Sequence, residues 1–313
     1  MQPPPDLTNA IARLLDGVSR KDLVAAAAKI SADYRQGATS QAIVTPAQAA
    51  AYAVARMPAT TAACAAVFAR LAGVMPGFAP ATLLDVGAGT GAASWAATGQ
   101  WAGITSVTML DHNPALRALA RKLADAGALA GAEILSGNLA SAKPKADLVV
   151  ASYVLAELPV DRAGMVAADL WQSADVALAL IEPGTPDGFA RIRAARAALI
   201  AAGAHVAAPC THDVLCPLTG DDWCHFSQRL PRSRDHMLLK EAHVPFEDER
   251  YSYVVVTREK VSSGARVLAP PLETKPGMTF KLCDEGGLRA LFVASRDKDE
   301  YRRVRKHGWG DLF

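Results

Sequence analysis

The sequence predicts an α/β fold, in which a mostly parallel sheet carries helices on both faces and is preceded by a helical extension. Three observations lead to this prediction. Short apolar strands alternate with helical stretches from about residue 81 onward, and repeated βα units build parallel sheets. A glycine-rich turn at 84–91 follows the first of these strands and opens a helix. The first 78 residues have a helix-forming composition.

The N-terminal extension, residues 1–78, is expected to be helical from residue 6 to about 75. Thr45 and Pro46 form a helix start, with a hydroxyl that caps the helix and a proline in its first turn. The stretches 49–56 and 59–71 continue with helix-forming residues. We expect this extension to cover one face of the domain that follows.

The α/β domain is assigned to residues 79–208 together with 250–258. Its expected strands lie at 82–86, 106–110, 132–135, 147–152 and 175–181. Periodicity stops at Pro209, so 209–249 is expected to be a cysteine-rich insertion, and 250–258 resumes as the last strand. The C-terminal region 259–313 is basic at its end, and a small β unit is expected there at 278–282 and 291–295.

Composition excludes several classes of protein and predicts a location. The net charge is only +2, so overall charge does not by itself indicate a nucleic-acid partner. No apolar run reaches the roughly 20 residues of a membrane-spanning helix. The start of the chain lacks the basic segment and apolar stretch of a signal peptide. We therefore expect a cytoplasmic monomer without a membrane partner.

Asp85, Gly87, Gly89 and Gly91 mark a nucleotide-binding turn between the first strand and its helix. Glycines allow positive φ, and they let backbone amides at a helix N-terminus approach an anionic group. A dinucleotide site has two residues before its third glycine, whereas Thr90 alone stands there in this chain. The turn therefore resembles motif I of class I methyltransferases, and it predicts a Rossmann-like domain that binds S-adenosylmethionine. The alternative is a glycine turn in an unrelated α/β domain.

Further cofactor contacts are expected at the ends of the next two strands. Asp111, about 20 residues after the glycines, is an acidic residue suited to the ribose hydroxyls. Asn138 follows the third strand, in the place that would hold the adenine edge. The complete set of predicted cofactor-binding residues is Asp85, Gly87, Ala88, Gly89, Gly91, Asp111, Asn138 and Leu139.

Tyr153 and Glu157 are the candidate catalytic residues, because they follow the fourth strand and the carboxyl ends of strands face the ligand in this fold. The Asn/Asp-Pro-Pro-Tyr motif of methyltransferases that act on exocyclic amines is absent from this position, as is a catalytic cysteine. The alternative is that Tyr153 packs in the fold and Glu157 caps a helix. Methyl transfer needs mainly the alignment of nucleophile, methyl group and sulfur, so these absences do not exclude activity.

Four cysteines in the last third of the chain predict a metal site: Cys210, Cys216, Cys224 and Cys283. Four thiolates can hold a zinc ion or an iron–sulfur cluster. Their spacing is wider than in zinc modules, and a proline follows Cys216 as in bacterial ferredoxins. We therefore favour a [4Fe–4S] cluster, with zinc as the alternative. The interpretation without a metal is that these are ordinary buried cysteines.

Three further residues are weighed with these cysteines. His212 and His225 lie beside them and are rival ligands, although a histidine near a metal more often hydrogen-bonds a ligand than binds the metal. Cys64 lies in an alanine-rich helix, so it is expected to be a small core residue.

Several segments together resemble one family, the methyltransferase-like factors of the small ribosomal subunit that occur in bacteria and mitochondria. The segments are 52–60, 84–95, 152–158, 181–186, 209–217, 223–229 and 302–310. The resemblance covers nearly the whole chain from about residue 30, and 223–229 with the cysteines is its most specific part. It implies an iron–sulfur site at the four cysteines and association with 16S-type ribosomal RNA during assembly or translation.

Two basic groups fit an RNA partner. They consist of Arg229, Arg232, Arg234, Arg302, Arg303, Arg305 and Lys306. Such clusters contact phosphates and give salt-dependent binding, and an aromatic residue among them, Trp309, can stack on an unpaired base. The alternative is a solvated helix face, because acidic residues at 297, 299 and 300 dilute the positive charge of the tail.

Three functions are consistent with these observations. The first is a cofactor-dependent methyltransferase that acts on ribosomal RNA, which the intact glycine turn favours. The second is a non-catalytic assembly factor that keeps the cofactor and the cluster as structural elements, which the missing catalytic motif favours. The third is a small-molecule methyltransferase, which leaves the basic tail unexplained.

Overall fold

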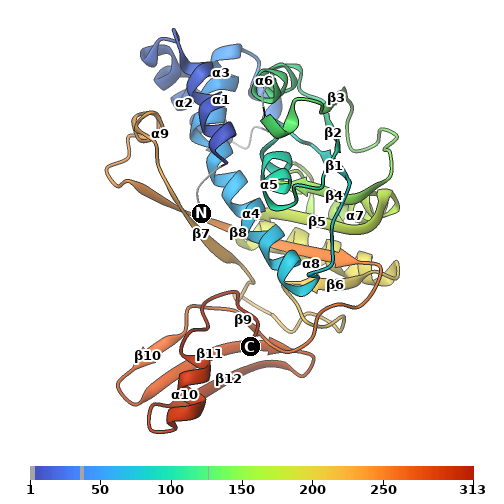
Figure 1. Ribbon diagram of the computed structural model, residues 1–313, viewed down its shortest axis with the longest axis vertical. Helices are drawn as coiled ribbons and strands as arrows, with labels where there is room; N and C mark the ends of the chain where they lie inside the picture. Colours follow the sequence, from blue (N-terminus) through green and yellow to red (C-terminus); the bar gives the residue numbers. More distant parts are fainter. Residues whose placement is uncertain (1–3, 36–38, 126) are drawn as a thin grey trace.

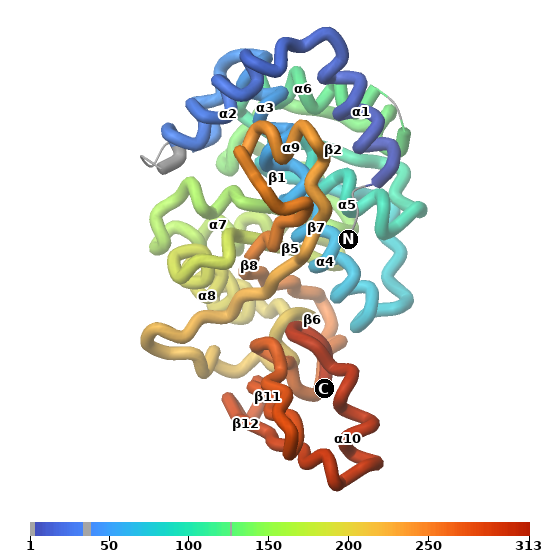
Figure 2. Tube along the Cα trace, turned by 90° about the vertical axis from the view of Figure 1, so that its left-hand side faces the viewer, coloured from blue at the N-terminus to red at the C-terminus, as the bar shows by residue number. Residues whose placement is uncertain are grey.

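The computed structural model describes residues 4–35, 39–125 and 127–313. Within these residues a mixed sheet is covered by helices, and a smaller antiparallel sheet forms the C-terminal end of the molecule (Figure 1). The N-terminal helices lie at the opposite end from this small sheet (Figures 1 and 2).

The large sheet has the strand order β3-β2-β1-β4-β5-β8-β6, and β7 pairs with β8 outside this path. The strands are β1 (Thr82–Val86), β2 (Ser106–Asp111), β3 (Glu133–Ser136), β4 (Ala146–Ser152), β5 (Ala174–Pro183), β6 (His205–Ala208), β7 (Phe226–Pro231) and β8 (Phe246–Thr257). The first five in this order are parallel, and β8 runs antiparallel between β5 and β6. The strand order reverses beside β1, which leaves a ligand crevice at the carboxyl ends of β1 and β4. This topology confirms the predicted Rossmann-like methyltransferase fold.

Each face of the large sheet packs on its own helices, because alternate residues of a strand point to opposite faces. In β5, Ala177, Ala179 and Ile181 face one core, and Leu178 and Leu180 face the other. The first core contains α4 (Met57–Val74), α5 (Ala92–Gln100) and α6 (Pro114–Ala124), and the second contains α7 (Val160–Ser173) and α8 (Pro186–Ala201). Short 3-10 turns complete the domain at η2 (Gly127–Leu129) and η3 (Leu155–Glu157).

The N-terminal extension is helical, as expected. It consists of α1 (Pro5–Leu15), α2 (Arg20–Arg35), η1 (Ser40–Ala42) and α3 (Pro46–Ala55), followed by α4. Thr45 caps α3 by accepting a hydrogen bond from the Gln48 backbone N–H, and the Gln48 side chain accepts one from the Thr45 backbone N–H. This reciprocal pair is a capping box, so the predicted helix start is confirmed.

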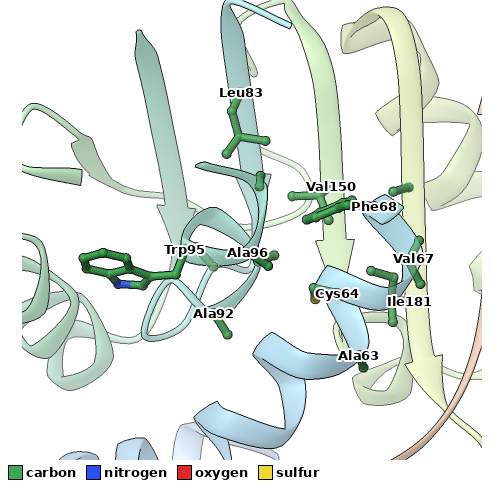
Figure 3. Packing of buried hydrophobic residues seen from close by; sticks show 14 of the residues in the cluster. Ala63, Cys64, Val67, Phe68, Leu83, Ala92, Trp95, Ala96, Val150 and Ile181 are labelled. Carbon is green, nitrogen blue, oxygen red and sulfur yellow. The ribbon is translucent and has the colours of Figure 1, made fainter. Parts of the chain in front are cut away.

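Helix α4 is long and apolar enough to cross a membrane by length and composition alone. It is instead a core helix of the α/β domain. Figure 3 shows Cys64, Val67 and Phe68 of α4 packed near Val150 and Ile181 of the sheet. Cys64 is fully buried in this cluster, which agrees with the expectation that it is a core residue.

The region 209–249 contains more regular structure than the sequence predicted. Strand β7 pairs with the first half of β8 to form an arm, and α9 (Arg234–Leu239) lies at its tip. Leu239 packs in a cluster with residues of α2 and α3, so the arm reaches back to the N-terminal helices (Figure 2). The first half of β8 alternates exposed and half-buried residues because one face is open to water. Sequence analysis also missed β6, which has only four residues.

The small sheet pairs β11 (Gly277–Asp284) with β12 (Gly287–Ala294), β10 (Leu272–Thr274) and β9 (Arg266–Val267). Helix α10 (Lys298–Val304) covers its core, which includes Phe280 and Leu282. The predicted β unit is therefore present, although its second strand begins four residues before the expected position at 291. The chain end is fixed by an ion pair of 2.7 Å between Arg70 of α4 and Asp311.

Candidate functional sites: a glycine-lined cleft and a cysteine-lined cavity

A cavity of about 960 Å³ opens at the carboxyl ends of β1, β2 and β4, and we call it the glycine-lined cleft. Its volume lies within the range typical of small-molecule sites. Seven of the predicted cofactor and catalytic residues line it, namely Gly87, Gly89, Asp111, Asn138, Leu139, Tyr153 and Glu157. Three predicted cofactor residues, Asp85, Ala88 and Gly91, are not among its lining residues.

The glycine turn adopts a backbone that only glycine tolerates easily. Gly87, Gly89 and Gly91 have φ values of +69°, +56° and +86°. A Cβ on Gly87 would lie 2.3 Å from Cγ2 of Val154, so the chain that follows β4 also requires a glycine there. The Gly87 backbone N–H donates to the Leu110 carbonyl oxygen at 2.7 Å, which fixes the turn against β2.

The two aspartates hold the turn from opposite sides. Asp85 is fully buried, and its Oδ2 accepts hydrogen bonds from the Ser94 backbone N–H at 3.1 Å and from the Ser94 hydroxyl at 2.7 Å. Burial raises the pKa of Asp85 to about 7. Asp85 thus fastens β1 to the start of α5. Asp111 accepts from the Gly89 N–H at 2.8 Å and from the Asn113 N–H at 2.7 Å, and it lines the cleft.

Part of the N-terminal extension covers the cleft, which sequence analysis did not anticipate. Asn113 donates through its side-chain amide to the carbonyl oxygens of Ser40 and Ile43, at 2.8 and 3.0 Å. Glu157 accepts a hydrogen bond from the Ser40 backbone N–H at 2.9 Å. The Glu157 side chain is exposed, and its carboxylate holds the η1 turn beside the cleft.

Tyr153 lies at the mouth of the cleft, in a left-handed conformation with φ of +61°. Its hydroxyl donates to Glu249 of β8 at 2.6 Å. Burial and the adjacent Glu249 carboxylate raise the pKa of Tyr153, so the phenol stays protonated at neutral pH. Tyr52 and Arg56 of the N-terminal extension line the same cleft. Sequence analysis missed Arg56 and Glu249 as site residues, although Arg56 lies in a segment that carried the family resemblance.

The four predicted metal ligands line one cavity, which we call the cysteine-lined cavity. Cys210 follows β6, Cys216 lies in the next loop, Cys224 precedes β7, and Cys283 is on β11. The cavity is therefore lined by segments of both the large sheet and the small sheet, and these segments can be followed in Figure 1. The four residues are up to 73 positions apart in sequence, so their meeting is a product of the tertiary fold.

Specific hydrogen bonds position the segment around Cys224. Trp223 donates through Nε1 to the Gly184 carbonyl oxygen at 3.0 Å. The Ser252 hydroxyl of β8 donates to the Cys224 carbonyl oxygen at 2.8 Å. Burial raises the pKa of Cys224 well above its usual value, and it raises that of Cys283 to about 12. As thiols without a metal, these side chains are therefore neutral.

The four cysteines line one cavity but do not form a compact set of metal ligands in this structure. The described residues include no group of three or more His, Cys, Asp or Glu side chains close enough together to hold a metal ion. The four cysteines surround a cavity instead of meeting at one point. A zinc ion about 2.3 Å from each sulfur would require sulfurs within about 4 Å of one another.

The two histidines have different surroundings. His212 is buried, its Nε2 lies 3.6 Å from the Cys283 sulfur, and its Nδ1 faces the Arg196 guanidinium at 3.4 Å. Because a guanidinium only donates, the Nδ1 lone pair faces it, and the proton of the neutral ring lies on Nε2, directed at the sulfur. His225 stacks on Trp223, with ring centroids 5.0 Å apart. His212 is thus placed to hydrogen-bond a cysteine.

The basic residues form two groups at opposite ends of the molecule (Figures 1 and 2). Arg229, on the arm, forms a bidentate ion pair with Asp248 at 2.7 Å, and Arg232 lies 3.4 Å from Glu247. Arg234 is exposed at the start of α9. Arg302, Arg303, Arg305 and Lys306 are exposed on α10 or just after it.

Trp309 does not lie free beside the basic group of α10. Its ring packs against His225, with centroids 5.1 Å apart, and against Phe226 of β7 at 6.2 Å. Arg302 and Arg303 pair with acidic residues one turn earlier in α10. The basic residues of the tail therefore share their helix with acidic neighbours, as the alternative interpretation expected.

Comparison with known proteins identifies relatives for most of the chain. Residues 46–313 match the family model described as mitochondrial small ribosomal subunit Rsm22. The human protein named ribosome assembly protein METTL17, mitochondrial, is 30% identical over 287 residues, covering 84% of this chain and 61% of that protein. The Schizosaccharomyces pombe Rsm22-cox11 tandem protein 2, mitochondrial, is 29% identical over 183 residues, covering 44% of this chain and 24% of that protein. This chain thus spans less than two thirds of the length of these relatives.

A solved structure with a similar fold is magnesium protoporphyrin IX methyltransferase from Synechocystis PCC 6803 with bound SAM. Its TM-score is 0.42 at 17% identity, over 64% of this chain and 80% of that chain. The expected cytoplasmic location is wrong on these comparisons, because the family and both relatives are named mitochondrial. The sequence argument failed because it tested only for a secretory signal, and lack of that signal does not distinguish the cytoplasm from an organelle.

Proposed function

This chain belongs to the Rsm22 family, and on that premise we propose that it is an assembly factor of the small ribosomal subunit. It binds S-adenosylmethionine in the glycine-lined cleft and holds an iron–sulfur cluster in the cysteine-lined cavity. The proposed partner is a small subunit of mitochondrial type, as the names of the relatives indicate. The observation that carries the proposal is the meeting of four cysteines from separate segments at one cavity.

The cofactor part of the proposal rests on the glycine turn. Gly87 and Gly89 leave their backbone exposed in the cleft, at the end of β1, and α5 begins just after Gly91. A helix N-terminus suits the carboxylate of the methionine moiety, because its partial positive charge favours an anion. Asp111 would then accept from the ribose hydroxyls in addition to the Gly89 N–H. Asn138 and Leu139 would lie beside the adenine.

The cluster part of the proposal rests on charge and spacing. The cysteines would bind as thiolates, and the cluster would tie the loop 209–225 to the small sheet and supply folding energy there. The preference for a cluster over zinc rests on the sequence, because the cysteine spacing is wider than in zinc modules and a proline follows Cys216 as in bacterial ferredoxins. His212 would hydrogen-bond Cys283 and is not assigned as a ligand.

A methyltransferase that acts on ribosomal RNA is the second candidate function. The observation in its favour is that Tyr153 and Arg56 line the cleft in addition to the expected cofactor residues, and that Glu249 holds the Tyr153 hydroxyl. Tyr153 would position an acceptor base, and Arg56 would contact a phosphate. Labelled-methyl transfer onto immature small subunits tests this function. If the protein keeps its cofactor binding and subunit association but transfers no methyl group, the methyltransferase function is rejected and the assembly-factor function stands.

The cluster is tested with a matched pair of cysteine variants, Cys224→Ala and Cys64→Ala. Protein purified without oxygen should be brown and contain about four iron atoms and four sulfides per chain. The Cys224 variant should lose this iron, whereas the Cys64 variant should keep it, because Cys64 is a core residue that does not line the cavity. Colourless protein with one zinc per chain would show that the site holds zinc and no cluster. Protein without metal would refute the metal site.

The ribosomal part is tested by sedimentation of the loaded protein with small-subunit precursors. The expected result is co-sedimentation that weakens as salt rises, because phosphate contacts release counterions. Large subunits serve as the control. Equal binding to both subunits would contradict a role specific to the small one.

A further inference from the structure

Two arginines are buried at the cysteine-lined cavity with donors that no described residue satisfies. Arg196, on α8, is 6% exposed and Arg266, on β9, is 1% exposed. Both line the cavity. Nε of Arg196 and Nη2 of Arg266 are buried without a hydrogen-bond partner. Burying a guanidinium removes its hydration, so a charged group in this position requires an anion close by.

The existing partners of Arg196 are not anions. Its Nη2 donates to the carbonyl oxygens of His212 and Val214, both at 2.8 Å, and approaches the His212 ring. These contacts fix the guanidinium beside the loop that carries Cys210 and Cys216.

The partners of Arg266, like those of Arg196, are neutral carbonyl oxygens. It donates to the Pro209 carbonyl oxygen at 2.6 Å and to the Gly310 carbonyl oxygen at 3.1 Å. It is paired directly opposite Cys283 in the antiparallel β9–β11 register. Residues opposite each other in such a pair project from the same face of the sheet. Arg266 and Cys283 thus lie on the same face of the small sheet, and both line the cavity.

We propose that Arg196 and Arg266 are the counter-charges of the metal–thiolate centre and set both its affinity for metal and its reduction potential. This inference rests on the metal-binding part of the proposed function. Four thiolates around a core of charge +2, as in a zinc ion or an oxidised [4Fe–4S] cluster, leave a net charge of −2. Two guanidiniums balance that charge within a buried site. Neutral thiols would leave both arginines without a counter-ion.

Arg193 provides a matched control. It lines the same cavity and lies on the same helix as Arg196, but it is exposed to water. Its guanidinium donates to the Leu218 carbonyl oxygen at 3.2 Å. Solvent screens an exposed charge, so Arg193→Gln should change metal binding little.

The experiment compares the full chain with its Arg196→Gln, Arg266→Gln, Arg193→Gln and Arg266→Lys variants. Zinc alone is the first probe, because it gives the same net charge as the oxidised cluster and is redox-silent. Competition with a chromophoric chelator should show a 10–100-fold loss of zinc affinity in each buried glutamine variant. Arg193→Gln should stay within about threefold. Arg266→Lys, which keeps the charge but not the guanidinium geometry, should lose less affinity than Arg266→Gln. Affinity compares loaded with metal-free protein, so losses of stability common to both states cancel.

The second probe is the protein reconstituted with ferrous iron and sulfide. Reduction adds a negative charge to the centre, so loss of a nearby cation should make the reduction potential more negative in the buried variants only. If a glutamine variant does not fold, Arg266→Lys still tests the proposal. A folded lysine variant that binds metal more than tenfold more weakly would contradict the proposal that the positive charge at position 266 sets the affinity. Equal affinities in the buried and exposed glutamine variants would overturn the inference while leaving the metal site intact. A wild-type chain that binds neither metal would overturn the metal site and this inference together.

Discussion

Replacing Gly87 with alanine is expected to lower the free energy of unfolding by about 2–5 kcal/mol. Two effects add in this estimate. Gly87 has φ of +69°, and a left-handed conformation costs an L-residue about 1–2 kcal/mol. The added Cβ would also lie 2.3 Å from Cγ2 of Val154, well inside ordinary carbon–carbon contact. Valine is stiff about χ1, and overpacking of this kind costs about 1–3 kcal/mol.

Gly89→Ala separates the two effects. Gly89 also has a left-handed φ, +56°, and lines the same cleft, but the nearest atom to its added Cβ is Leu116 Cδ1 at 3.9 Å. It should therefore show only the conformational cost of about 1–2 kcal/mol. In a Gly87→Ala/Val154→Ala double variant, the smaller residue at 154 should remove the overpacking cost of the Gly87→Ala substitution but not its conformational cost. The coupling energy between the two substitutions should therefore be about 1–3 kcal/mol.

Urea unfolding followed by circular dichroism measures these free energies, and calorimetry with S-adenosylmethionine measures the effect on the cleft. Cofactor affinity should fall more for Gly87→Ala than for Gly89→Ala if displacement of the Val154 segment distorts the cleft. Equal destabilisation by the two alanines, or no rescue by the smaller residue at 154, would refute the steric argument.

Three further predictions concern other parts of the chain. Burial raises the pKa of Glu182 to about 8, so between pH 4.5 and 8 the folded state holds a proton that the unfolded state has lost. The free energy of unfolding should therefore fall as pH rises, by up to about 1.4 kcal/mol per unit, and Glu182→Gln should flatten that slope in urea titrations at several pH values. Thr45→Ala removes the cap of α3 and should cost about 1 kcal/mol by the same assay, while an unchanged midpoint would exclude a role for the capping box. Neutralising residues 302, 303, 305 and 306 together should reduce the dependence of log binding constant on log salt by about 0.7–0.9 for each RNA phosphate that these side chains neutralise. An unchanged slope would mean that the tail does not touch RNA.

The α/β architecture was predictable because its signals are local. The central parallel strands β1 and β4 are short apolar runs, and the glycine turn specifies its own conformation through the positive φ of three glycines. The Thr45 cap is equally local, since both partners lie within three residues. The grouping of the four cysteines was predicted from residue type, and the structure brings them to one cavity.

The remaining features depend on contacts between distant segments. Nothing near Arg266 in sequence shows that it pairs with Cys283, because the small sheet creates that register. Glu249 could not be linked to Tyr153 before β8 was known to extend back to Phe246. Asp85 was expected in the cleft, but the sequence could not show that Ser94 already binds its carboxylate.

Strand β8 passes both sites within a few residues. Glu249 holds Tyr153 at the mouth of the cleft, Ser252 fixes the backbone of Cys224, and Tyr253 lines the cysteine-lined cavity. Removing β8 would therefore take away both the hydrogen-bond partner of Tyr153 and a residue that lines the cysteine-lined cavity. Loss of the metal should accordingly lower the protection of β8 backbone amides against hydrogen exchange, as far along the strand as Glu249.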